Sequence, residues 1–119
     1  MKHIVLSAFF LLILFCVSVF IFEPTHLYFL LPWLDIPMHI LGGFAVTSFT
    51  IAVATYGKQR FSLTQVLILY FCVAFVWELY EFIKDVVVYG VIWNGWPDTI
   101  SDIVNGGIGS VVAFFYFKK

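Results

Sequence analysis

The sequence predicts an all-α protein, a four-helix transmembrane bundle, from its composition and from the length and pattern of its apolar runs. Of its 119 residues, 63% are hydrophobic and only 11% are charged, against about 25% charged residues in an ordinary soluble domain. Polar side chains are too few to cover the exterior in water, which excludes a soluble monomer, and the same composition excludes a disordered chain. Strict polar–apolar alternation is absent, and this favours helices over a membrane β-barrel.

Four apolar segments are each close to the length of about 20 residues that a helix needs to cross a bilayer. They are residues 4–22, 36–56, 63–89 and 99–117. The first has no charged residue, and no small-residue cleavage site follows it, so we interpret it as an uncleaved helix. The third is longer than one span, so its acidic end should lie outside the hydrocarbon or face protein. We expect residues 1–119 to form a single membrane domain.

Basic residues predict the orientation of this bundle. Five of the six lie at the same ends of the predicted helices: Lys2, Lys58, Arg60, Lys118 and Lys119. The two connections at the opposite ends contain no Lys or Arg. Short loops rich in Lys and Arg stay in the cytoplasm, so both termini are expected inside (N-in/C-in). Lys84 is the exception.

Acidic residues gather at the other, outer ends of the helices. All seven are there: Glu23, Asp35, Glu78, Glu81, Asp85, Asp98 and Asp102. Counted from Arg60, Glu78 lies about 27 Å towards the outside, and counted back from Lys118, Asp102 lies about 24 Å away. His39 reaches a similar depth on the second helix. Three helices therefore bring ionisable side chains to one layer near the outer boundary of the hydrocarbon.

Within each helix, these polar residues are spaced so that they share one face. The three sets are Asp35 and His39, then Glu78, Glu81 and Asp85, and then Asp98, Asp102 and Asn105. Ionisable groups at this depth are costly and normally face a bundle interior or a wet cavity. We therefore expect an acidic, His-containing pocket that opens to the outside.

Several carboxylates in one pocket either disfavour one another's ionisation or recruit a cation. Lys84 is one candidate, and a divalent metal is the other, because carboxylates, an Asn carbonyl and one His suit Mg²⁺, Mn²⁺ or Zn²⁺. The predicted ligands are His39, Glu78, Asp102 and Asp35. Glu81 or Asp98 is the predicted catalytic base for metal-bound water. Asn105, Lys84 and Asp85 are expected around these ligands.

Each of these residues also has a purely structural interpretation. Asp35 and Asp98 are placed to cap helix N-termini, and His39 fits a buried, hydrogen-bonded histidine. Glu81 and Asp85 fit a solvated helix end with local ion pairs. The sole role of Asn105 would then be to hydrogen-bond one helix to another. Glycines 42, 43, 106, 107 and 109 either let helices pack closely or leave room for a ligand. The Trp and Tyr residues near this layer are typical of an interfacial belt.

At these polar residues the chain resembles a known family. The pattern Asp35-x-x-x-His39, Glu78-x-x-Glu81 and Asp102-x-x-Asn105-x-x-x-Gly109 is similar to the VanZ-like small bacterial membrane proteins, and Trp96-Pro-Asp-Thr-x-x-Asp102 resembles the YjdF-like group. The likeness covers the second to fourth helices. VanZ-like proteins often have Gln at the position of Glu81, followed by an Arg, and this chain has only Lys84 nearby. The resemblance implies a bacterial inner-membrane location but supplies no mechanism.

Three functions fit these observations. The first is a membrane protein of the cell envelope that binds a divalent metal in its outer pocket and acts on, or binds, a lipid headgroup; whether it is an enzyme stays open. The second is a small cation-coupled transporter, and the third is a structural or accessory subunit. A homo-oligomer is compatible with so small a core. No basic patch suggests nucleic acid as a partner.

Overall fold

The computed structural model describes residues 1–90 and 95–118, and this part of the chain is helical without any strand. Four helices are long and apolar enough to span a membrane. They cover Lys2–Phe22, Pro32–Tyr56, Leu63–Val88 and Trp96–Phe117. The predicted fold class is therefore confirmed, and the predicted ends are close to the observed ones. The largest differences are at two starts: the second span begins at Pro32 rather than at residue 36, and the last helix begins at Trp96 rather than at residue 99.

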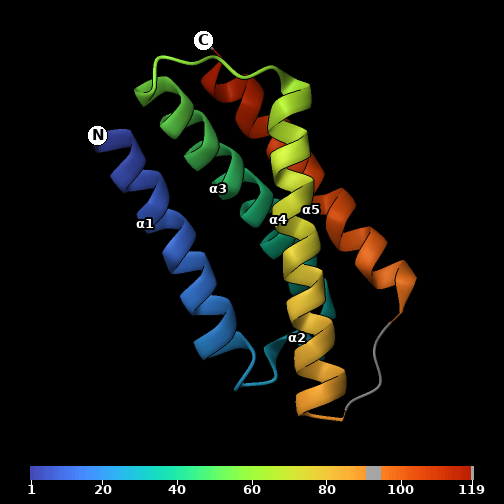
Figure 1. Ribbon diagram of the computed structural model, residues 1–119. Helices are drawn as coiled ribbons and strands as arrows, with labels where there is room; N and C mark the ends of the chain where they lie inside the picture. The colour runs from blue at the N-terminus through green and yellow to red at the C-terminus, as the bar shows by residue number, and fades with distance from the viewer. Residues whose placement is uncertain (91–94, 119) are drawn as a thin grey trace.

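The helices follow one another in a simple order along the chain (Figure 1). They are α1 (Lys2–Val17) with a π-helical extension (Ser18–Phe22), α2 (Leu27–Leu30), a 3₁₀ turn (Pro32–Leu34), α3 (Asp35–Tyr56), α4 (Leu63–Phe82) with a π-helical extension (Ile83–Val88), and α5 (Trp96–Phe117). Both termini lie at one end of the bundle, and α2 lies at the other.

The helix starts are set by different local devices. Ser62 caps α4, because its hydroxyl accepts from the backbone N–H of Gln65, whose side chain accepts in return from the Ser62 N–H. Leu34 and Gly95 stand at the N-caps of α3 and α5. The prediction that Asp35 and Asp98 cap these helices was therefore wrong. Both lie in the first turn, where a carboxylate still interacts favourably with the helix dipole.

The tightest packing in the bundle is between α3 and α5. A Cβ added to Gly43 would overlap the backbone of Gly106, and one added to Gly109 would overlap the carbonyl group of Ile40. Close approach of two backbones is what small residues allow in membrane helices. Beside this contact, the buried hydroxyls of Thr47 and Ser110 share a hydrogen bond.

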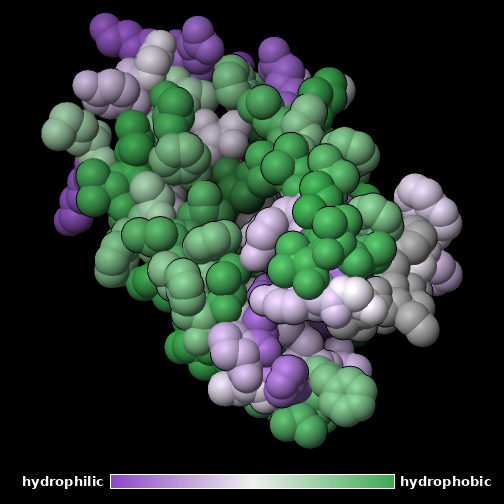
Figure 2. All heavy atoms as spheres, turned by 60° about the horizontal axis from the view of Figure 1, so that its bottom comes forward, coloured by the Kyte–Doolittle hydropathy of each residue, from purple (hydrophilic) through white to green (hydrophobic). Residues whose placement is uncertain are grey.

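The outer helices complete the bundle on two sides. α1 packs on α3, and α4 packs on α5 and α3. The ring of Phe15 on α1 meets the ring of Trp77 on α4 edge to face, with centroids 6.1 Å apart. Large apolar side chains remain exposed along all four long helices, and Figure 2 shows hydrophobic residues over most of the visible surface. An exterior of this kind fits contact with lipid rather than water.

Candidate functional site

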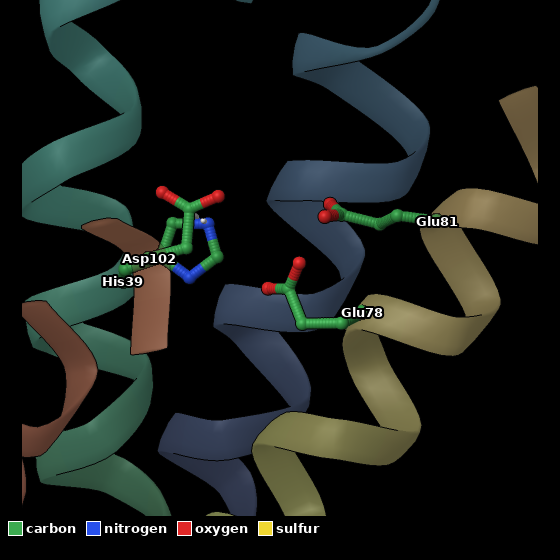
Figure 3. Close-up of side chains that lie close together, drawn as sticks. All are labelled: His39, Glu78, Glu81 and Asp102. Carbon is green, nitrogen blue, oxygen red and sulfur yellow. Dashed lines mark ion pairs between the residues drawn. The ribbon is translucent and has the colours of Figure 1, made fainter. Parts of the chain in front are cut away.

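Four ionisable side chains from three helices meet inside the bundle (Figure 3). They are His39 of α3, Glu78 and Glu81 of α4, and Asp102 of α5. Each offers one ligand atom, and these atoms all lie within 4.8 Å of one another. We call these four residues the acidic cluster. The cluster combines the polar faces that the sequence predicts on three separate helices.

The imidazole of His39 lies between two carboxylates. Its Nε2 is 3.3 Å from Oδ1 of Asp35, one turn earlier on α3, and 3.6 Å from Oδ1 of Asp102 on α5. The spacing of four residues along α3 places Asp35 and His39 on the same face. Asp102 is only 5% exposed, because α5 crosses α3 closely just below it. The His39 ring is thus held by a neighbour on its own helix and by the opposite helix.

A second group of carboxylates overlaps the acidic cluster. Asp35, Asp98 and Asp102 also have oxygens within 4.8 Å of one another, with Asp98 exposed and Asp102 buried. Asp102 belongs to both groups. The structure therefore brings together all the residues that the sequence indicates as metal ligands or catalytic bases, in two adjoining sets rather than one. Glu81 lies among the candidate ligands, and Asp98 lies at the exposed side.

The three residues expected around the ligands have partners elsewhere. The Lys84 Nζ is 2.9 Å from Oε1 of Glu23 and 3.7 Å from Oδ1 of Asp85. The basic residue that departs from the charge pattern therefore has acidic partners at its own end of the bundle. The side-chain amide of Asn105 donates to the hydroxyl of Ser101 on the same helix, at 3.2 Å. The ion pairs of Lys84 are thus with Glu23 and Asp85, and the hydrogen bond of Asn105 is within α5.

The acidic cluster forms part of the wall of a cavity of about 520 Å³, within the range of about 300–1,000 Å³ that is typical of small-molecule sites. Asp35 also lines the cavity, and the other walls are largely apolar side chains of α1, α3 and α4. They include Phe15, Met38, Val46, Phe49, Val73 and Trp77. Polar and apolar walls in one cavity fit a ligand that has both a charged and an apolar part.

Sequence reasoning missed the contribution of the first helix, and it expected the loop after that helix only as an apolar roof over the pocket. Ser18, near the C-terminal end of the first span, and Tyr28, in α2, both line the cavity, and their hydroxyls share a hydrogen bond of 2.8 Å. Burial raises the pKa of the Tyr28 hydroxyl above its usual value. The sequence analysis placed Tyr28 in an interfacial belt. The sequence signal that could have indicated Ser18 is a hydroxyl residue near the end of a largely apolar span.

Tyr70 is a second residue that the sequence analysis did not single out. It is buried on α4 and lines the cavity. Its hydroxyl donates to the carbonyl oxygen of Ile103 on α5 at 2.8 Å. The hydroxyl also fills the space beside Gly106, where an added Cβ would overlap it. Tyr70 therefore holds α4 against α5 below the acidic cluster.

Comparison of the chain with protein-family models, with curated proteins and with solved structures finds no match. The resemblance to the VanZ-like and YjdF-like groups therefore stays a prediction.

Proposed function

We propose that this chain is a small envelope membrane protein that binds a divalent metal ion in the acidic cluster and, through that ion, the headgroup of a lipid. The convergence of one imidazole and three carboxylates within 4.8 Å is the observation that carries the proposal. Mg²⁺ and Mn²⁺ favour such oxygen-rich sets, and Zn²⁺ accepts one imidazole with carboxylates. A bound ion would also offset the repulsion among the carboxylates.

In this proposal His39, Glu78, Glu81 and Asp102 hold the ion. Asp35 orients the His39 imidazole, as carboxylates commonly do behind metal-bound histidines. A divalent ion at this position would supply a positive charge for a phosphate group and would acidify a bound water. Asp98, exposed beside Asp35 and Asp102, would act as the base that accepts a proton from that water.

Metal binding is tested by unfolding the purified protein with and without Mn²⁺. A ligand that binds only the folded state at 100 times its dissociation constant stabilises it by about 2.7 kcal/mol. We expect stabilisation of this order in the wild type and its loss in the double variant Glu78→Gln/Asp102→Asn. Asp85→Asn is the matched control, because it also removes one carboxylate from the outer end of the bundle but lies outside the acidic cluster.

The result also separates a metal site from a purely structural cluster. If the double variant unfolds more easily but Mn²⁺ stabilises it as much as the wild type, the metal proposal fails and the cluster only joins helices. If Mn²⁺ has no effect on the wild type, and Mg²⁺ and Zn²⁺ have none either, the proposal fails as well.

The proposed orientation has the acidic cluster towards the outside and both termini in the cytoplasm. The positions of the basic residues support it, because Lys2 begins α1, Lys58 and Arg60 lie between α3 and α4, and Lys118 follows α5, at the end of the bundle that carries the termini. In a chain with Cys16 and Cys72 replaced by Ala, a cysteine at Thr25 should react with an impermeant maleimide in intact cells. A cysteine at Lys58 should react only after lysis, and the reverse pattern would invert the orientation.

A further inference from the structure

The cavity beside the acidic cluster extends far beyond the four candidate ligands. Along α3 its lining runs from Asp35 to Phe49, a distance of about 21 Å at the helical rise. Charged residues occur only towards one end of this length, and the remaining walls are largely apolar. No Lys or Arg is found among the described residues that line it. A metal ion alone would use only the charged end of such a cavity.

Two adjacent glycines on α3 both line the cavity but differ in what an added side chain would meet. Gly43 faces α5, where an added Cβ would overlap the backbone of Gly106. Gly42 lines the cavity, and an added Cβ there would meet no atom within 4 Å. The close helix contact therefore explains Gly43 but not Gly42. At position 42 the absence of a side chain keeps the cavity open beside the acidic cluster.

The volume of the cavity is large enough for an apolar chain. A methylene group takes nearly as much space as a water molecule, whose share of the liquid is about 30 Å³, so about 520 Å³ corresponds to roughly 17 such groups. That is the size of one hydrocarbon chain of moderate length. The aromatic contact between Phe15 and Trp77 places two rings on the cavity wall between α1 and α4, beside such a chain.

We propose that this cavity binds a single-chain lipid phosphate, with its hydrocarbon chain along the apolar walls beside Gly42 and its phosphate at the acidic cluster. This inference rests on the proposed function, because the cavity lining has no Lys or Arg and the bound ion would supply the positive charge that holds a phosphate group beside the carboxylates. Charge complementarity between phosphate, ion and carboxylates then favours the headgroup, and the length and volume of the cavity match one hydrocarbon chain.

The test uses Trp77 as a reporter, because its ring lines the cavity. Trp33, Trp93 and Trp96 are replaced by Phe, and the protein is placed in phosphatidylcholine nanodiscs. Dodecyl phosphate with bromine at mid-chain is then titrated with and without Mn²⁺, and unbrominated dodecyl phosphate corrects for effects of the ion. We expect saturable quenching of Trp77 that requires Mn²⁺. Quenching by ligand dissolved in the surrounding bilayer would not saturate and would not depend on the ion.

Gly42→Leu tests the position of the chain, because the new side chain would fill the cavity from α3. Each methylene group that is kept out of an apolar site lowers affinity roughly fourfold, so the loss should be about tenfold or more. Ala74→Phe narrows the cavity from α4 and should give the same loss if Gly42→Leu does not fold. Val112→Phe is the matched control, since Val112 is 54% exposed on α5 and does not line the cavity.

The outcomes distinguish this inference from the proposed function. If Mn²⁺ stabilises both wild type and Gly42→Leu but the quenching is unaffected by Gly42→Leu and Ala74→Phe, the chain-binding inference is wrong and the metal site stands. If Mn²⁺ does not stabilise the wild type, the proposed function fails and the inference fails with it. If brominated dodecyltrimethylammonium quenches Trp77 without any metal and the phosphate does not, the phosphate headgroup is refuted.

Discussion

The pair Gly42 and Gly43 offers a controlled test of the close contact between α3 and α5. The two glycines are neighbours on the same helix and differ in what an added methyl group would meet. On Gly43 a Cβ would lie 2.6 Å from the carbonyl carbon and 2.8 Å from the Cα of Gly106. Real Cβ atoms essentially never lie closer than 3.0 Å to such an atom. On Gly42 it would meet nothing within 4 Å. Replacing each by Ala therefore separates packing from helix propensity.

The expected difference follows from two opposing effects. Alanine stabilises a helix interior over glycine by about 0.8–1.0 kcal/mol, and this gain is common to both variants and cancels between them. In Gly43→Ala the obstructing atoms are backbone, which no rotamer change can remove, so α3 and α5 must move apart. Overpacking of this kind costs about 1–3 kcal/mol. Gly43→Ala should therefore have a free energy of unfolding about 1–3 kcal/mol below that of Gly42→Ala.

Both variants can be compared by reversible unfolding in mixed micelles with increasing SDS, followed by far-ultraviolet circular dichroism. Gly42→Ala should unfold at the same SDS fraction as the wild type or a higher one, and Gly43→Ala at a clearly lower one. If the two variants unfold within about 0.5 kcal/mol of each other, which is the size of ordinary surface effects, the helices are not in the contact described here.

Three further substitutions address individual contacts under the same unfolding conditions. Tyr70→Phe removes the hydroxyl that donates to Ile103 and should lower the free energy of unfolding by about 0.5–1.5 kcal/mol. Thr47→Val leaves its buried hydroxyl partner on α5 without a hydrogen bond and should cost about 1–3 kcal/mol; an unchanged midpoint would contradict that bond. For Glu23 and Lys84, a double-mutant cycle with Glu23→Gln and Lys84→Met should give a coupling energy of about 0.5 kcal/mol or more. Strict additivity would show that the pair does not form.

The helices were predictable because their signals are local. Apolar runs of the length of a bilayer, separated by short polar connections, mark each span without reference to the rest of the chain. The errors occurred at the helix starts, where Asp35 and Asp98 were expected at N-caps and lie inside the first turn. Helix α5 begins earlier because Gly95, with a φ of 93°, supplies the turn before it, and Pro97 is accepted in the first turn.

The depth of the candidate site along the helices was predictable from the sequence, but which residues contact one another there was less so. The rise of a helix places Glu78, Asp102 and His39 in one layer, and the structure indeed brings them together. The sequence alone left open whether Lys84 lies among these carboxylates, because a long side chain can reach more than one acidic partner. Its contact with Glu23 depends on how the end of α1 lies against the end of α4, and no spacing along the chain contains that information.

By itself the sequence determined that this is an all-helical membrane protein with a polar layer at one end, because hydropathy, span length and depth follow from consecutive residues. Only the tertiary structure decided which polar groups meet, and that Gly43 packs against the backbone of α5 while Gly42 faces open space in the cavity. The physical reason is that the rotation and crossing of each helix are set by side chains far apart in the chain. Two neighbouring residues of the same type therefore have different surroundings: Gly43 faces the backbone of Gly106, and Gly42 faces open space.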